Sequence, residues 1–393
     1  MSKNKKKINY NKTLKIRKSN NDTLFKVDVK DRRILILYTG GTIGMVETIK
    51  GHIPKKGYLQ RKLKNYLKTN NSKDSHEPLS KYDVISLDPL LDSSNIHIKD
   101  WNRIISKINK YYHQYSAFII IHGTDTLAYT ASALSFAFEN LDKPIIITGS
   151  QIPIQNLKND GWNNLITSLI LASQTHIPEV LVVFSDHVLR GNRSKKISAN
   201  KIDAFESPNY EKLGNFGFLT SKKNPYNWTL EAALLKKENY SSQRNDERFT
   251  ATFYNENIEV IIIYLTPGFN PENIIHMIGK NRNIKGAILV SFGVGDGPTS
   301  DKNFIRMLSV LDKHHIIVLN ITQCVSGHID SNDYETGIML QKYNVISGND
   351  MTLECGYAKL LYLLSKYRLN NIGPLLETSI RGELSPTPTS FEI

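Results

Sequence analysis

Hydroxyl, carboxylate and lysine side chains that could act together occur at a few points of this 393-residue sequence. The hydroxyls and carboxylates are those of Thr39, Thr42, Asp92, Ser93, Ser94, Thr124, Asp125, Thr148 and Ser150, and the lysines are Lys195 and Lys196. A desolvated or ion-paired lysine can take a proton from a threonine hydroxyl, and a carboxylate can orient that lysine. The remaining hydroxyls and loop amides can hold a small polar substrate and its oxyanion. The set therefore predicts nucleophilic chemistry by a threonine.

Each of these residues also has a simpler interpretation. Thr and Asp directly after strands are common helix N-caps, so any single one is more often structural than catalytic. The GGTIG sequence of residues 40–44 could bind phosphate, but it lacks the ending of a P-loop and the full spacing of a dinucleotide fingerprint. GVGDG at residues 293–297 is similarly incomplete. The histidines lack metal-ligand spacing, so we expect neither a metal nor another cofactor.

The elements that would position these side chains are buried strands followed by short turns. Residues 34–38 are an unbroken apolar run, and Gly40 and Gly41 after it let the backbone turn sharply. Ligands of open α/β sheets bind beyond the carboxyl ends of the strands, where Thr42 lies. Further strands are predicted over 82–87, 117–121, 144–147 and 179–184, and helices over 99–112, 127–139 and 160–173. This alternation predicts a doubly wound parallel α/β sheet.

The length allows two domains, because single cores stop growing at roughly 250–300 residues. We expect a basic tail over 1–31, a larger N-terminal domain with the nucleophile loop over 32–225, a linker over 226–256 and a smaller α/β domain over 257–393. The second domain has predicted parallel strands over 259–265, 287–292 and 316–321 and a helix over 351–367. Residues 46–80 are polar and predict a long loop, in the position of a lid, with a short helix near 59–67. Residues 206–255 lose the alternation of strands and helices, and a hairpin is expected there near the N-terminal domain.

Composition and charge exclude several classes of protein. Residues 1–33 carry a net charge of +9, so only +4 of the total of +13 falls on the other 360 residues. We interpret the tail as a solvated arm and expect no nucleic-acid partner. No apolar run is long enough to span a bilayer, and no secretory signal is recognisable, so no membrane partner is expected. The two cysteines give no disulfide framework, which is typical of a cytoplasmic protein.

Three motifs resemble the signatures of bacterial-type L-asparaginases: TGGTIGM at 39–45, HGTDTLAYTASALSF at 122–136 and ITGSQIP at 147–153. TQCVSG at 322–327 and MTLE at 351–354 are similar to the cytoplasmic type I branch. The resemblance runs from about residue 32 to about residue 385. TGGTIG and HGTDT at this separation are specific together, although neither would be alone.

The resemblance implies a role for each matching residue. Thr42 matches the nucleophilic threonine that attacks the side-chain carboxamide, and Thr124 matches a second threonine beside the reacting amide. Asp125 matches the aspartate that holds the substrate α-ammonium and orients a lysine. Lys196 matches that lysine, although Lys195 beside it leaves the register open by one residue.

The DSSN sequence of residues 92–95 matches the loop that holds the substrate, so Asp92, Ser93 and Ser94 are implied as binding residues, with Ser93 foremost. One departure concerns the lid, where type I members have a sequence close to GYIP. This chain has GHIP, so His52 stands where a catalytic tyrosine is expected. An imidazole can act as a base near neutral pH, so we include His52 among the catalytic candidates.

The resemblance implies an L-asparaginase that hydrolyses L-asparagine to L-aspartate and ammonia through a threonine acyl-enzyme. It also implies a homodimer or homotetramer. Two alternatives stay open. The chain could be a non-catalytic or impaired amino-acid-binding homologue, which the His52 departure favours. It could also be an amidohydrolase of the amidotransferase type that acts with tRNA, although that class carries a full extra N-terminal domain.

Overall fold

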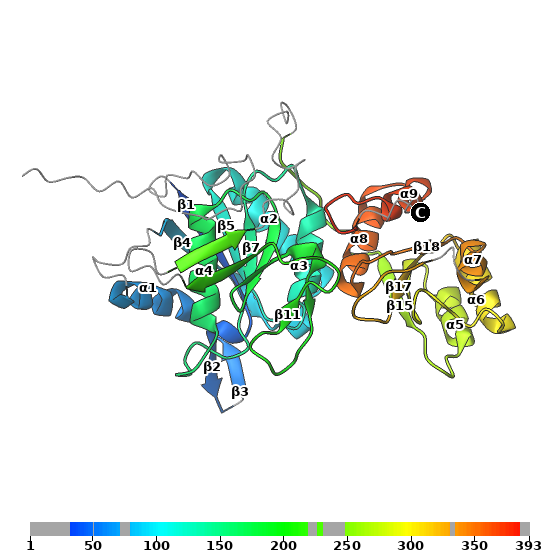
Figure 1. Cartoon of the computed structure of the whole chain (residues 1–393), viewed down its shortest axis with the longest axis horizontal. Coiled ribbons are helices and arrows are strands. Elements are labelled where there is room, and N and C mark those ends of the chain that lie inside the picture. Colours follow the sequence, from blue (N-terminus) through cyan, green and yellow to red (C-terminus); the bar gives the residue numbers. More distant parts are fainter. Residues whose placement is uncertain are drawn as a thin grey trace, which may run out of the picture.

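The chain forms two α/β domains, which lie side by side in Figure 1. The computed structural model describes residues 32–49, 51–70, 79–218, 226–230, 248–330 and 335–385. The predicted basic tail and part of the predicted linker lie outside these residues. Within the described residues no helix combines the length and apolarity needed to cross a membrane.

The N-terminal domain is built on an eight-stranded sheet in the order β13-β12-β9-β8-β7-β5-β1-β4. Its parallel part comprises β4 (Lys81–Leu91), β1 (Arg33–Gly40), β5 (Ala117–Ile121), β7 (Ile145–Thr148) and β8 (Val180–Phe184). Helices cover both faces, because alternate residues of each strand point to opposite sides. Leu35 and Leu37 share a core with α2 (Ile98–Tyr111) and α3 (Leu127–Ala137), whereas Ile34 and Ile36 pack with α1 (Tyr58–Asn70) and α4 (Gly161–Gln174). The predicted doubly wound sheet is confirmed.

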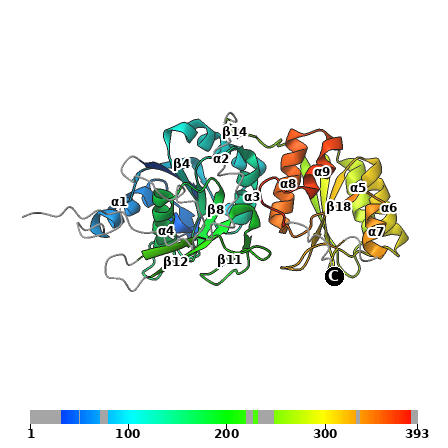
Figure 2. The ribbon, with the colours of Figure 1, turned by 45° about the horizontal axis from the view of Figure 1, so that its top comes forward.

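The C-terminal domain has a four-stranded parallel sheet in the order β15-β16-β17-β18. Its strands are β15 (Glu259–Tyr264), β16 (Ile284–Ser291), β17 (Ile317–Thr322) and β18 (Val345–Ser347). α5 (Pro271–Lys280) and α6 (Lys302–Lys313) cover one face, α8 (Leu353–Lys366) and α9 (Ile372–Glu377) cover the other, and α7 (Glu335–Gln341) precedes β18. α8 also packs against α3, so a single apolar core continues from one domain into the other (Figure 2).

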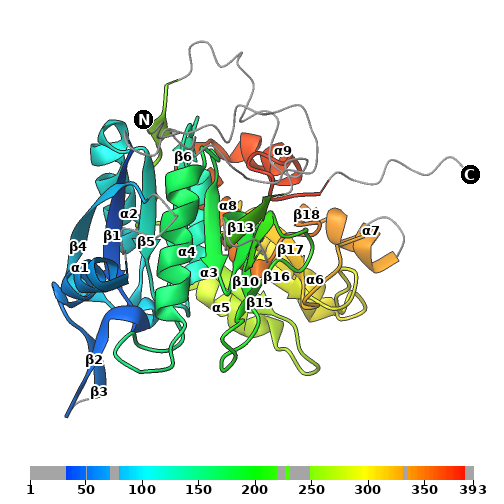
Figure 3. The same ribbon diagram turned by 60° about the vertical axis from the view of Figure 1, so that its left-hand side comes forward.

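One expectation about the N-terminal domain was wrong. The start of the predicted loop over residues 46–80 is a hairpin, because β2 (Met45–Thr48) and β3 (Gly51–Pro54) pair, whereas the short helix predicted near 59–67 is present as α1 (Figure 3). The sheet also has an antiparallel edge, which comprises β9 (His187–Arg190), β12 (Gly214–Phe218) and β13 (Tyr226–Leu230). Ser185 and Asp186 join β8 to β9 with positive φ, and a two-residue turn of this kind connects antiparallel strands.

Two small strand pairs complete the described structure. β10 (Lys195–Lys196) pairs with β11 (Phe205–Glu206), and β6 (Phe138–Glu139) pairs with β14 (Thr250–Ala251). β12 and β13 form the hairpin that the sequence suggested within residues 206–255, near the N-terminal domain. β10 matters most for function, because it carries both candidate lysines.

Candidate active site

Glycines bring the carboxyl ends of β1, β4 and β5 into close contact. A Cβ on Gly41 would lie 2.4 Å from the Cα of Gly123, and a Cβ on Gly123 would lie 2.4 Å from the Ser93 Oγ. Gly41 also has a φ of 81°, a conformation that L side chains rarely adopt. No larger residue fits at either position without moving the backbone. The turns that carry Thr42, Ser93 and Thr124 therefore meet at one point of the sheet edge.

Thr42 is the first residue of a short 3-10 helix (Thr42–Gly44) between β1 and β2, and it is partly exposed. The two residues after it are buried, and the carbonyl of Ile43 accepts a hydrogen bond from the Ile154 amide at 3.2 Å. In the part of the chain that the structure describes, the Thr42 hydroxyl has no hydrogen-bond partner. It is therefore available to a ligand, and the hydrogen bonds of Lys196 in the described structure go to Thr124 and Asp125, not to Thr42.

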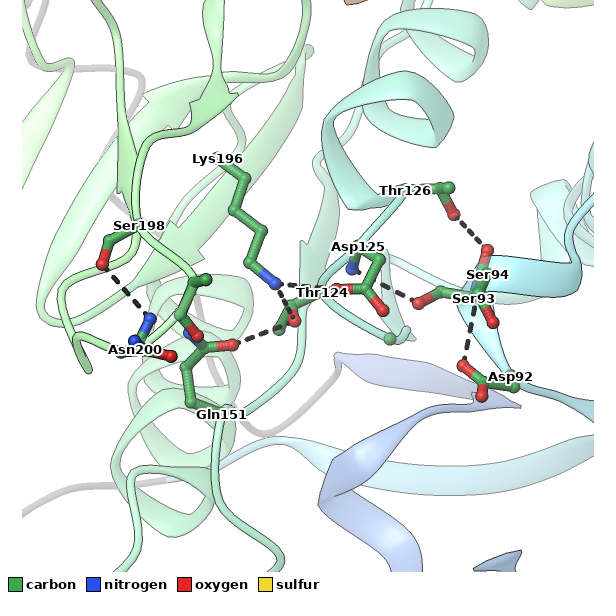
Figure 4. Close-up of polar contacts among 12 residues, drawn as sticks. Asp92, Ser93, Ser94, Thr124, Asp125, Thr126, Gln151, Lys196, Ser198 and Asn200 are labelled. Atoms are coloured by element: carbon green, nitrogen blue, oxygen red, sulfur yellow. Dashed lines mark hydrogen bonds and ion pairs between the residues drawn. The ribbon is translucent and has the colours of Figure 1, made fainter.

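Three of the predicted site residues do meet (Figure 4). The Lys196 Nζ donates to the Thr124 Oγ1 at 2.9 Å and to the Asp125 Oδ1 at 2.8 Å. Thr124 is buried, and the Lys196 side chain is only 19% exposed, whereas that of Asp125 is 60% exposed. The lysine therefore reaches from a sheltered position to a hydroxyl and a carboxylate, and the carboxylate faces outward.

Gln151 also contacts Thr124, and the sequence did not identify it as a site residue. Its Nε2 donates to the carbonyls of Ala199 and Lys201 at 3.1 and 3.2 Å, so its Oε1 must face the Thr124 Oγ1 at 3.0 Å. An amide oxygen only accepts, so the Thr124 hydroxyl donates to Gln151 and accepts from Lys196. These contacts fix the position of the Thr124 proton.

Alternation along β10 separates the two adjacent lysines. Side chains of neighbouring strand residues point to opposite sides, and Lys196 points to Thr124. Lys195 points to α8 of the C-terminal domain, where its Nζ lies 3.2 Å from the Glu354 Oε1. The sequence left open whether Lys195 or Lys196 is the site lysine. In the structure Lys196 contacts Thr124 and Asp125, and Lys195 does not.

The loop after β4 contributes mainly through Ser93. This residue is buried in a 3-10 turn (Ser93–Asn95); its Oγ accepts from the Asp125 amide at 3.3 Å, and its carbonyl accepts from the Thr126 hydroxyl at 2.8 Å. Asp92 and Ser94 are exposed, and the Asp92 carboxylate accepts from the Ser94 amide at 3.4 Å. Ser93 therefore joins the β4 and β5 loops, and Asp92 acts as a turn cap.

Other predicted hydroxyls have structural roles. Those of Thr39 and Thr148 donate to the carbonyls of Ile121 and Val183 on neighbouring strands, and that of Ser150 donates to the Ile152 carbonyl. His52 lies on β3 opposite Glu47, and its side chain is not among the described parts of the structure. The described residues include no group of three or more His, Cys, Asp or Glu side chains able to hold a metal.

His122, directly before Gly123, is a second residue that sequence reasoning missed. It is fully buried, and burial lowers the pKa of its imidazole to about 4. The Gly123 carbonyl only accepts, so the His122 Nδ1 donates to it at 2.7 Å, and the Nε2 accepts from the Thr130 hydroxyl at 3.0 Å. The neutral ring therefore supports the turn that carries Thr124.

Comparisons with known proteins agree with this architecture. Residues 33–231 match the family model "Asparaginase, N-terminal", and residues 259–371 match "Glutaminase/Asparaginase C-terminal domain". L-asparaginase 1 of Escherichia coli K12 is 37% identical over 363 residues, covering 91% of this chain and 99% of that protein. The crystal structure of L-asparaginase I from Vibrio cholerae superposes with a TM-score of 0.78 at 35% identity, covering 90% of this chain and 99% of the other. The thermostable L-asparaginase of Thermococcus kodakarensis gives a TM-score of 0.74 at 28% identity, covering 90% and 100%.

Proposed function

The chain belongs to the asparaginase family, and we propose that it hydrolyses L-asparagine to L-aspartate and ammonia with Thr42 as the nucleophile. The observation that carries this proposal is the contact of Lys196 with both Thr124 and Asp125. A lysine held against a hydroxyl and a carboxylate is suited to proton transfer, and the neighbouring turn offers a hydroxyl without a partner among the described residues.

Two displacements make up the proposed reaction. The Thr42 oxygen attacks the side-chain carboxamide carbon, and the proton of the Thr42 hydroxyl passes to the amide nitrogen. The bond between carbon and nitrogen then breaks, so that ammonia departs and an acyl-enzyme ester remains on Thr42. Water then attacks the ester carbon and returns the proton to the Thr42 oxygen, which releases L-aspartate. Lys196 and Thr124 would move protons in the water step, since Thr124 is joined to the lysine. No cofactor is needed for either step.

Substrate binding is assigned to the exposed groups around this cluster. The Asp125 carboxylate is positioned by Lys196 but remains open to solvent, so it is suited to hold the α-ammonium group. The loop of Asp92, Ser93 and Ser94 lies beside it, with Ser93 bonded to the Asp125 amide. We assign this loop to the α-carboxylate and the ammonium group.

The β2–β3 hairpin follows Thr42 directly, and we assign it the role of the lid. His52 on β3 would supply a base in place of the tyrosine of other family members.

We further propose a cytoplasmic homodimer or homotetramer. Cys324 and Cys355 are both free, as is usual for proteins in a reducing compartment.

Ammonia release from asparagine, glutamine and buffer alone, measured for the wild type and for Thr42→Ala, tests the proposal. We expect release from asparagine by the wild type and a loss of at least about a thousandfold in kcat for Thr42→Ala. Thr378→Ala in the C-terminal domain is a matched control that should keep full activity, because among the described residues its hydroxyl bonds only the Pro374 carbonyl. Asparagine binding without ammonia release by the wild type would favour the non-catalytic alternative.

A further inference from the structure

Residues 380–385, here called the C-terminal clasp, contact the segment of the N-terminal domain that leads to Lys196. This segment is a 3-10 turn (Gly191–Arg193) directly before β10. The Arg193 Nε donates to the Gly382 carbonyl at 2.9 Å, and the Asn192 Nδ2 donates to the Arg381 carbonyl at 3.0 Å. The turn is therefore bonded to residues about 190 positions later in the sequence.

Arg193 uses each nitrogen of its guanidinium in this junction. Its Nη1 donates to the Asp350 Oδ2 at 2.7 Å, and its Nη2 donates to the Ser385 Oγ at 3.4 Å. The other Asp350 oxygen accepts from the Ser385 amide at 3.1 Å. The side chain of Arg193 is only 2% exposed, so these contacts are sheltered from water. A planar fork with three acceptors at fixed positions has little freedom to move.

The clasp is itself anchored to the C-terminal domain. The Glu383 carboxylate accepts from the amides of Ile380 and Arg381 and forms an ion pair with Lys359 of α8 at 2.7 Å. Lys359 and Glu383 are both 0% exposed. Arg193 therefore binds a segment that a buried ion pair joins to α8 of the C-terminal domain.

Lys196 lies three residues after Arg193, and both Arg193 and Lys195 before it make contacts that hold the backbone in place. The Arg193 carbonyl accepts from the Ser207 hydroxyl at 3.0 Å, next to β11, and Lys195 is paired with Glu354 of α8. The backbone of β10 is thus located by contacts with the C-terminal domain. A displacement of about 1 Å in a reacting group can lower a rate by about a hundredfold.

We propose that Arg193, held by Asp350 and the C-terminal clasp, is a positioning residue that places the Lys196 amine against Thr124 and Asp125. The C-terminal domain thereby controls the geometry of a site in the N-terminal domain of the same chain. This inference rests on the proposed function, because the role of Lys196 belongs to it.

Arg193→Lys in the full chain tests the proposal, because lysine keeps the charge beside Asp350 but cannot reach three acceptors. We expect kcat for asparagine to fall at least about tenfold while KM stays within about twofold. Arg381→Lys is the matched control and should keep wild-type kcat. Its side chain belongs to the clasp but contacts Glu139 and the Ile380 carbonyl, not the turn before β10.

A double-mutant cycle with Lys196→Met separates positioning from a general loss of structure. If Arg193 acts through Lys196, Arg193→Lys lowers the residual rate of Lys196→Met by less than about twofold. An equal fold-loss in both backgrounds, or a wild-type kcat for Arg193→Lys, would overturn the proposal. Every variant is assayed well below its melting temperature.

Should Arg193→Lys not fold, Asp350→Asn addresses the same junction from the C-terminal domain, with the same expected results and the same cycle. The activity of the wild type separates a failure of the proposed function from a failure of the positioning role. A wild type that releases no ammonia contradicts the proposed function, whereas an active wild type with an unaffected Arg193→Lys and Asp350→Asn contradicts the positioning role alone.

Discussion

The amide of Gln151 determines the direction of the Thr124 proton, because its oxygen can only accept from the Thr124 hydroxyl. In Gln151→Met the acceptor that faces the Thr124 hydroxyl is lost, and so are the bonds that the Gln151 Nε2 donates to the carbonyls of Ala199 and Lys201. The Thr124 proton is then no longer directed away from Lys196, so we expect kcat for asparagine to fall by about tenfold or more. Gln151→Glu keeps an oxygen acceptor opposite Thr124 and should lose less of kcat than Gln151→Met. Ammonia release at saturating asparagine measures both variants, and a wild-type kcat for Gln151→Met would show that Gln151 does not direct the Thr124 hydroxyl.

Some residues of the candidate site could be predicted from the sequence, and others could not. Thr124, Asp125 and one of two lysines were identified because they follow strand ends or match family motifs. Only the pairing of β10 decided between Lys195 and Lys196, because it gives the two side chains opposite directions. Gln151 was not identified, because its amide is held by the backbone carbonyls of residues 199 and 201. Every residue has a backbone carbonyl, so the sequence gives no sign of such contacts.

At the scale of elements, His122 joins the end of β5 to α3 and, through Thr130, to Trp101 of α2. The folded protein keeps this ring neutral down to a pH of about 4, whereas in the unfolded chain its pKa is about 6.5. The free energy of unfolding should therefore fall as the pH drops below 6.5, by about 2 kcal/mol at pH 5, with no contribution above 6.5.

Urea unfolding at pH 7.5 and pH 5 measures this effect against His122→Gln, which cannot titrate. The wild type should lose about 2 kcal/mol more than the variant between the two pH values. His276→Gln on the exposed side of α5 is the control and should keep the wild-type pH dependence. Equal losses for wild type and His122→Gln would contradict the role of the buried ring.

The parallel strands of the N-terminal domain and the helices between them could be predicted from apolar runs and helical repeats. In the C-terminal domain α5, α6 and β18 were not predicted. One hairpin was expected, but the hairpins β8–β9 and β2–β3 were not. Ser185 and Asp186 form the β8–β9 turn in the left-handed region, where Gly and Asn are the usual signals. β2 and β3 are short and mostly polar, so the sequence showed them only as part of a loop.

At the scale of the whole molecule, the two domains share structure that no local pattern reveals. α3 and α8 are separated by more than 200 residues and pack together in one core. The same junction includes the C-terminal clasp, which also bonds to residues distant in the sequence, such as Arg193. Two family domains could be expected from the sequence, but their junction could not, because it depends on pairs of residues and not on either segment alone.

The buried ion pair of Lys359 and Glu383 gives the last prediction. Lys359 also donates to the carbonyls of Leu376 and Thr378, so a single amine joins α8, α9 and the clasp. Removing one partner leaves a buried charge without compensation, so Lys359→Met and Glu383→Gln should each lower the free energy of unfolding by about 3–5 kcal/mol. The double variant should lose clearly less than the sum, because neither charge then remains.

Urea unfolding of the two single variants and the double variant measures these energies. Glu272→Gln, which breaks the exposed pair with Arg306, is the matched control and should cost less than about 1 kcal/mol. Because the Lys359–Glu383 pair anchors the residues that hold Arg193, the single variants should also lose activity at temperatures where they remain folded. A cost below about 1 kcal/mol for Lys359→Met would show that the clasp is not anchored by this pair.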